Sequence, residues 1–134
     1  MQKRSFGMLG EISSLTLGGG GIGQVWGPTT REEAVATVRE AIDSGIDFLD
    51  VAPSYGNGET ESVIGEAFGG RLPPGVRVST KYAVRNLPPD DVLPSLERSL
   101  GESLARTKLN MVDLFLLHSM IIPDDTTDRH QGTP

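Results

Sequence analysis

The sequence contains no cysteine among its 134 residues, which excludes disulfide bonds and thiolate chemistry. Its apolar stretches all fall short of the roughly 20 residues that a helix needs to cross a bilayer, so we expect no membrane partner. Basic residues near the start are not followed by an apolar run of about 7 or more, so we expect no secretory signal. The cytoplasm is therefore the expected location.

Positive charge is also scarce. The chain has 12 lysines and arginines against 18 aspartates and glutamates, and its formal net charge is -6. Nucleic-acid-binding surfaces neutralise phosphates with clustered basic residues, whereas the basic residues here are scattered. We therefore expect no nucleic-acid partner. A hydrophobic content of 37% and a charged content of 22% are typical of a soluble globular protein.

Segments typical of strands and helices alternate along the chain. We expect a hairpin and first strand over 1–17, and the strand segments are 14–17, 46–50, 76–81 and 111–118. Helices are expected after the cap candidates Thr29 and Thr30, over 59–68, and from Pro88, with Pro94 in the first turn of the last one. The apolar stripe of that helix is Leu93, Leu96, Leu100 and Leu104.

This alternation predicts a parallel α/β sheet, either doubly wound or part of a (β/α)₈ barrel. A full barrel usually needs about 250 residues and eight strands, and four strands are expected here. The apolar run at 111–118 is typical of a strand that is covered on both faces. We expect a single partial domain over 1–134, which ends in a polar tail at 124–134 that includes a solvated His130.

A glycine cluster follows the first strand. Gly18, Gly20 and Gly23 match the spacing of a dinucleotide-binding turn, in which a helix begins within the glycines. Here the first cap candidate comes only at Thr29, and the acid expected about 20 residues on falls inside a helix, near Asp43. A Rossmann-type nucleotide binder is thus a weaker alternative. A flexible loop and a close approach of the backbone to a ligand are the other two.

Four residues with chemically active side chains lie at the carboxyl ends of strands, namely Asp50, Tyr55, Lys81 and His118. The ends of parallel strands share one rim, so these residues can meet. A carboxylate that ends an apolar strand needs a cation, and Lys81 ends the next strand. That pair could serve only to fix strand register. A nearby ammonium also favours the phenolate of Tyr55, which would let the phenol donate and accept a proton.

Two further residues of the same rim have alternative interpretations. His118 alone is most often a satisfied core or rim residue, although a neutral imidazole can donate a hydrogen bond to a substrate carbonyl. Trp26 could line an apolar substrate pocket or simply cover the barrel end.

Glu102 and Arg106, in the last expected helix, are typical of an i,i+4 pair on a solvated helix face.

Residues 45–56 resemble the signature region of the aldo-keto reductases, as do residues 79–81 and 95–118. Residues 15–18 are similar to the first barrel strand of that family. The resemblance extends from about Arg4 to His118. It implies a (β/α)₈ barrel of which this chain holds an N-terminal hairpin and the first four strands, a half-barrel. It also implies the use of NADP(H), or sometimes NAD(H), without metal, to reduce aldehydes and ketones or to oxidise alcohols.

The resemblance also implies individual roles. Tyr55 would be the general acid and base, Lys81 its electrostatic support, and Asp50 the partner of Lys81. His118 would orient the carbonyl, so that Tyr55 and His118 face a small-molecule substrate. Trp26 is the third candidate for contact with the substrate, on its position in the rim loop alone. The backbone of Gly18, Gly19 and Gly20 would lie with Asp50 beside the nicotinamide ribose.

Two departures from the family accompany the resemblance. Thr is common in the family where Gly19 and Val51 stand, which affects local cofactor contacts. The family holds the rest of the cofactor on later strands, so we expect incomplete cofactor binding by these 134 residues alone. A half-barrel also exposes unpaired strand edges and an apolar face. The alternative is a non-catalytic fragment or regulatory protein on this scaffold, and the sequence does not indicate an oligomeric state.

Overall fold

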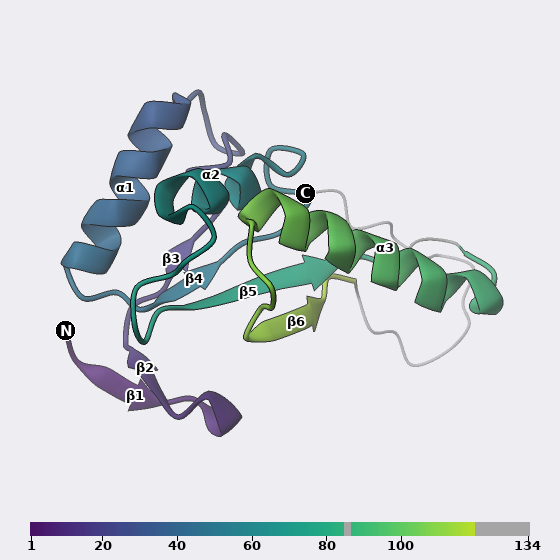
Figure 1. Cartoon of the computed structure of the whole chain (residues 1–134), viewed down its shortest axis with the longest axis horizontal. Coiled ribbons are helices and arrows are strands. Elements are labelled where there is room, and N and C mark those ends of the chain that lie inside the picture. Colours follow the sequence, from purple (N-terminus) through teal and green to yellow (C-terminus); the bar gives the residue numbers. More distant parts are fainter. Residues whose placement is uncertain (85–86, 120–134) are drawn as a thin grey trace.

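The computed structural model describes residues 1–84 and 87–119. Figure 1 shows a small hairpin set apart from a sheet whose helices lie along one side. In chain order, the elements are β1 (Lys3–Ser5), the 3₁₀ helix η1 (Gly7–Leu9), β2 (Glu11–Ser13), β3 (Leu17–Gly18), α1 (Arg31–Asp43), β4 (Phe48–Asp50), α2 (Glu59–Phe68), β5 (Arg77–Tyr82), α3 (Pro89–Thr107) and β6 (Leu114–Leu117). No helix of the described ranges is both long and apolar enough to span a membrane.

The main sheet has four parallel strands in the order β3-β4-β5-β6. Each strand pairs with the next one along the chain, and a helix connects β3 to β4, β4 to β5 and β5 to β6. A doubly wound sheet instead reverses its strand order and carries helices on both faces. The sequential order and the one-sided helices (Figure 1) therefore favour the partial barrel.

The hydrophobic core lies between this sheet and the first two helices. Its fully buried members include Val38 of α1, Leu49 of β4, Val63 and Ile64 of α2, and Val78 of β5. Burial of side chains of this size supplies the main driving force for folding. The core thus fixes β4 and β5, the two strands from which Asp50 and Lys81 come, against α2.

The first helix begins and ends where the sequence predicts. Thr30 caps α1 and forms a full capping box with Glu33, because each side chain bonds the other residue's backbone N–H. Gly45 follows the helix with a φ of 92°, a left-handed conformation that glycine adopts without strain. The bounds of α2 match the predicted 59–68.

The hairpin is joined to the sheet through Asp47. The Asp47 carboxylate pairs with Lys3 of β1 and accepts a 2.6 Å hydrogen bond from the backbone N–H of Ser13 in β2. Burial by itself raises the pKa of Asp47, but the hydrogen bonds from Lys3 and Ser13 outweigh it and leave the pKa below its usual value. The ionised carboxylate therefore holds the hairpin in place.

The strand predicted over 14–17 is wrong in its bounds. Only Leu17 of that range is in β3, which continues to Gly18. The serine hydroxyls before it bond main-chain carbonyls instead, Ser13 to Leu15 and Ser14 to Gln2. The first bond is local and of the kind that competes with a strand ladder, whereas the second ties Ser14 to the hairpin, so both keep these residues out of β3.

The last helix and strand also differ from prediction. Because α3 begins at Pro89, Pro94 lies inside the helix and not in its first turn. Leu93 is 61% exposed, since the amino-terminal half of α3 projects beyond the sheet (Figure 1). The strand β6 is not covered on both faces, because Leu116 and Leu117 at its end are exposed.

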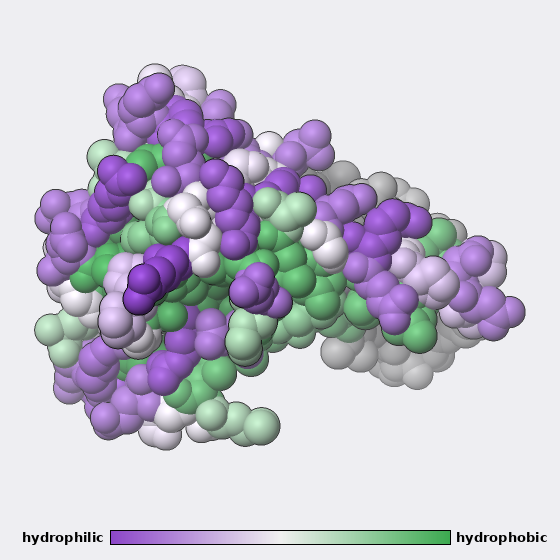
Figure 2. Space-filling model, in the orientation of Figure 1, coloured by the Kyte–Doolittle hydropathy of each residue, from purple (hydrophilic) through white to green (hydrophobic). Residues whose placement is uncertain are grey.

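Apolar side chains consequently reach the surface. Figure 2 shows hydrophobic residues on the face over α3 and the strands beside it. From residue 84 onward, the large hydrophobic residues that are exposed are Val84, Leu93, Met111, Leu116 and Leu117. A half-barrel is expected to expose apolar side chains of this kind. The tail at 124–134, with His130, lies outside the described residues.

A buried ion pair connects α2, α3 and β5. The Glu61 side chain is completely buried, and its carboxylate accepts hydrogen bonds from Thr80 Oγ1 at 2.6 Å and Arg106 Nε at 2.7 Å. The expected pair of Arg106 with Glu102 is present, but at 3.9 Å. Arg106 therefore serves mainly to compensate the buried charge of Glu61, and its pairing with Glu102 on the helix surface is secondary.

Replacing Arg106 with alanine tests this ion pair. The substitution leaves the Glu61 carboxylate buried without its cation, so we expect it to lower the free energy of unfolding by about 3 kcal/mol, the low end for a buried pair because Arg106 is partly exposed. Arg98→Ala on the exposed surface of the same helix should cost no more than about 0.5 kcal/mol. Urea unfolding measures both, and equal effects would contradict the proposed compensation.

Candidate active site

The site is built around an ion pair between neighbouring strands. Lys81 of β5 is only 8% exposed, and its Nζ lies 2.8 Å from Asp50 Oδ1 at the end of β4. The same ammonium donates to the carbonyl oxygen of Val51, also at 2.8 Å. The expected pair is therefore present, and two of the three N–H donors of Lys81 are used in it.

Ser79 also contributes to this pair, and the sequence analysis missed it. Asp50 lies opposite Ser79 in the parallel register, and Ser79 and Lys81 share one face of β5 because they are two residues apart. The Ser79 hydroxyl donates to the same carboxylate oxygen, Asp50 Oδ1, at 2.5 Å. Asp50 is thus held from two positions of the adjacent strand.

Tyr55 joins the pair from the loop after β4. Its backbone N–H donates to the carbonyl of Ala52 at 3.1 Å, which closes a tight turn and returns the side chain toward the strand ends. Lys81 Nζ lies 4.9 Å from the centroid of the Tyr55 ring, within the range of a cation–π interaction. The phenol therefore lies in the field of a buried ammonium.

His118 lies beside the Tyr55 ring. Its backbone N–H donates to the carbonyl of Tyr82 at 2.7 Å, directly after β6. The two rings stand edge to face, with centroids 5.8 Å apart and planes at 89°. Partial burial and then the Lys81 ammonium lower the pKa of His118, while Asp50 raises it less. The neutral imidazole therefore dominates at neutral pH.

A pocket of about 330 Å³ opens beside these groups. The residues that line it are Gly18, Gly19, Gly20, Val25, Trp26, Asp50 and Tyr55. Trp26 is 80% exposed, and a Cβ at Gly20 would lie 2.9 Å from its ring atom Cζ2. The structure thus brings the predicted glycines and Trp26 together at Tyr55, whereas His118 is not among the residues that line the pocket and lies beside the Tyr55 ring.

The glycine cluster is not a dinucleotide-binding turn. The helix α1 begins at Arg31, after the Thr30 cap, so the glycines do not form its amino terminus. A Cβ at Gly19 would lie 2.6 Å from Thr60 Cγ2 and 3.2 Å from Tyr55 Cδ2. These glycines allow a close approach to another loop of the protein. The Rossmann alternative is therefore wrong.

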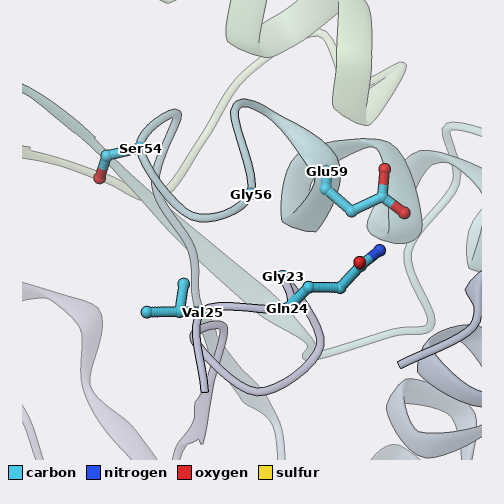
Figure 3. Close-up of a pocket in the computed structure, with 6 residues that line it drawn as sticks. All are labelled: Gly23, Gln24, Val25, Ser54, Gly56 and Glu59. Carbon is cyan, nitrogen blue, oxygen red and sulfur yellow. The ribbon is translucent and has the colours of Figure 1, made fainter. Parts of the chain in front are cut away.

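A second pocket, of about 390 Å³, continues along the rim (Figure 3). Its lining residues are Gly23, Gln24, Val25, Ser54, Gly56 and Glu59, and Val25 lines both pockets. The Glu59 carboxylate is engaged by the guanidinium of Arg31. Within residues 1–84 and 87–119, no three His, Asp or Glu side chains gather in a way that could hold a metal ion.

The family model described as the aldo/keto reductase family matches residues 14–128. The chain therefore belongs to the aldo-keto reductases. Solved structures of this family are similar to the chain as well. One is an aldo-keto reductase of Klebsiella pneumoniae in complex with NADPH, which aligns with a TM-score of 0.72 and 28% sequence identity. The alignment covers 92% of this chain and 42% of that one. The four-stranded sheet is part of a (β/α)₈ barrel.

Two other relatives are similar at the level of sequence. L-galactose dehydrogenase of Arabidopsis thaliana is 32% identical over 123 residues, which cover 90% of this chain and 39% of that protein. A thermostable aldo-keto reductase, Tm1743, solved with the inhibitor epalrestat, is 35% identical at a TM-score of 0.72, covering 92% and 45%. The chain thus spans about two fifths of the length of these relatives.

The pKa of His118 offers a direct test of the site's electrostatics. Lys81→Met removes a positive charge that lowers the pKa of His118, so the pKa should rise. Asp50→Asn removes a negative charge that raises it, so the pKa should fall. NMR titration of the imidazole, assigned with His118→Gln, measures both. A fall with Lys81→Met, or no change with either substitution, would contradict the observed arrangement.

Proposed function

We propose that this chain carries the proton-transfer part of an NAD(P)H-dependent reductase that converts aldehydes or ketones to alcohols, or runs the reverse oxidation. The observation that supports it is that Asp50 and Tyr55 line one pocket, while Lys81 pairs with Asp50 and lies over the Tyr55 ring. His118 stands beside the same ring. A buried cation beside a phenol is a costly arrangement that a purely structural pair does not need.

Tyr55 is the general acid in the direction of reduction. As the carbonyl carbon accepts a hydride, its oxygen becomes negative and takes the proton of the Tyr55 hydroxyl. The phenolate left behind is stabilised by the Lys81 ammonium, which lies over the ring. Asp50 and the Val51 carbonyl hold that ammonium in place. In the reverse direction, the phenolate accepts the proton of the alcohol.

His118 orients the substrate. Because its pKa lies below the usual value, the imidazole is neutral at pH 7 and keeps one N–H to donate. A hydrogen bond from that N–H to the carbonyl oxygen would stabilise the negative charge that develops there. Trp26, which also lines the pocket, offers an aromatic wall to the rest of the substrate.

The pocket fits the nicotinamide end of the cofactor. When bound, the nicotinamide supplies the hydride. Gly18, Gly19 and Gly20 leave the pocket wall without side chains, and Asp50 lies beside them, so these four residues would hold the ring and its ribose. The described residues that line the pocket include no lysine or arginine for the phosphates.

The isolated chain should therefore bind NADPH weakly. Without a cation at the phosphate end, we expect titration of the 134-residue chain with NADPH, followed by nicotinamide fluorescence, to show no saturation at micromolar cofactor. NADH should behave alike. Saturable micromolar binding would contradict the assignment of the phosphate end to residues outside this pocket.

Replacing Tyr55 with phenylalanine tests the proton-transfer role. With NADPH at millimolar concentration, Tyr55→Phe should slow aldehyde reduction by about 10²-fold or more, as expected for loss of a general acid, and leave cofactor binding unchanged. Tyr82→Phe is the matched control, because the Tyr82 hydroxyl is buried without a hydrogen-bond partner in the described residues and lies outside the lining of both pockets. Retained activity in Tyr55→Phe would show that the role is wrongly assigned.

A second candidate is a non-catalytic protein on the same scaffold. It is favoured by the exposed apolar residues Leu116 and Leu117 of β6. The wild-type chain decides between the two. Failure of the folded chain to reduce any aldehyde or oxidise any alcohol at millimolar cofactor would favour the non-catalytic candidate.

A further inference from the structure

Two loops of the rim lie directly against each other. We call residues 19–27 the glycine loop and residues 52–58 the tyrosine loop. Figure 3 shows Gly23 of the first beside Gly56 of the second. A Cβ at Gly56 would lie 2.3 Å from the carbonyl oxygen of Gly23, so the two main chains are in contact with no room for a side chain between them.

A single side chain of α2 forms hydrogen bonds with both loops. Thr60 of α2 is completely buried, and its hydroxyl lies 3.2 Å from the carbonyl oxygen of Gly19 and 3.1 Å from that of Tyr55. A hydroxyl has one proton, so the two carbonyls share it in a three-centre hydrogen bond. One acceptor comes from each loop. The position of the Tyr55 main chain is thereby tied to that of Gly19.

Gly19 is in turn fixed to the ion pair. Its backbone N–H donates to the carbonyl oxygen of Asp50 at 2.8 Å, while the Asp50 carboxylate holds Lys81. The Thr60 hydroxyl therefore closes a path from Tyr55 through Gly19 and Asp50 to Lys81. The loop is closed tightly around it, because a Cβ at Gly23 would lie 2.2 Å from Thr60 Oγ1.

We propose that Thr60 is a positioning residue, whose hydroxyl sets the placement of Tyr55 relative to the Asp50–Lys81 pair. Its effect on catalysis rests on the proposed function, but its effect on the loops does not. Removal of the hydroxyl would take from each carbonyl its shared bond to Thr60 Oγ1, leaving Gly19 with the Gly23 N–H at 2.9 Å and Tyr55 with the Thr60 N–H at 3.4 Å. Neither remaining bond joins the two loops, so the tyrosine loop would shift relative to the glycine loop. The methyl group of Thr60 only fills space.

The test compares Thr60→Val, which keeps the shape and loses the hydroxyl, with Thr60→Ser, which does the reverse. In the 134-residue chain, Thr60→Val should make the Gly19 and Gly23 amides exchange about tenfold faster with solvent, as expected for loss of one buried hydrogen bond, and should shift the ring NMR signals of Tyr55. Thr60→Ser should restore both. Thr107→Val removes an equally buried hydroxyl far from the rim and should leave these signals unchanged.

The outcomes separate this proposal from the proposed function. Unchanged exchange and Tyr55 signals in Thr60→Val, or equal effects in Thr60→Ser, would overturn it. If the wild-type chain reduces aldehydes, Thr60→Val should lower kcat about tenfold with little change in KM. If the wild-type chain is inactive, the proposed function fails, but the NMR comparison still decides the role of Thr60.

A second pair of variants serves if Thr60→Val does not fold. Gly23→Ala places a methyl group 2.2 Å from Thr60 Oγ1, 3.0 Å from the Tyr55 carbonyl oxygen and 3.1 Å from the Gly19 carbonyl oxygen, so it should disrupt the three-centre hydrogen bond as a whole. Gly21→Ala, in the same loop, meets its nearest atom at 3.8 Å and is the matched control. Faster exchange of the Gly19 amide and a shifted Tyr55 ring in Gly23→Ala, but not in Gly21→Ala, are expected. Equal behaviour of the two variants would contradict the proposal.

Discussion

The buried ammonium of Lys81 is the interaction on which the rest of the rim depends. Lys81 is 8% exposed, and burial of an ammonium is costly unless other groups compensate its lost hydration. Asp50 and the carbonyl of Val51 do so directly, and Ser79 holds Asp50. Because Asp50 also accepts a bond from Gly19 through its main chain, the same residue fixes both the cation and the glycine loop. Compensation of one charge thus organises the site.

Much of this site follows from the sequence, since alternating strands and helices place the strand ends on one rim. The capping box of α1 and the bounds of α2 follow as well, because they depend on local chemistry. The roles of Thr60 and Val51 could not be predicted, since both act through main-chain carbonyls that meet only in the folded chain. The apolar pattern of β6 was misleading for a related reason. An apolar run indicates that a strand favours burial, but the strand is buried only if other elements pack against both of its faces.

The position of the hydrophobic core explains both the well-packed ion pair and the exposed apolar residues. The core lies against α1, α2 and the strands β4 and β5, so the residues of the ion pair are well supported. The strand β6 and the helix α3 lie farther from that core and leave Leu93, Leu116 and Leu117 exposed. His118, which follows β6, is accordingly the most exposed member of the four. Burial of the four side chains therefore decreases from Lys81, which is buried, to His118, which is exposed.

The central claim is that Lys81 and Tyr55 act as one proton-transfer unit. A double-mutant cycle on the rate of aldehyde reduction, with Tyr55→Phe, Lys81→Met and both together, tests it most directly, because groups that act together have non-additive effects. The account predicts that the double variant is no slower than Tyr55→Phe alone. If the two rate losses instead multiply, Lys81 and Tyr55 act independently and the account is wrong.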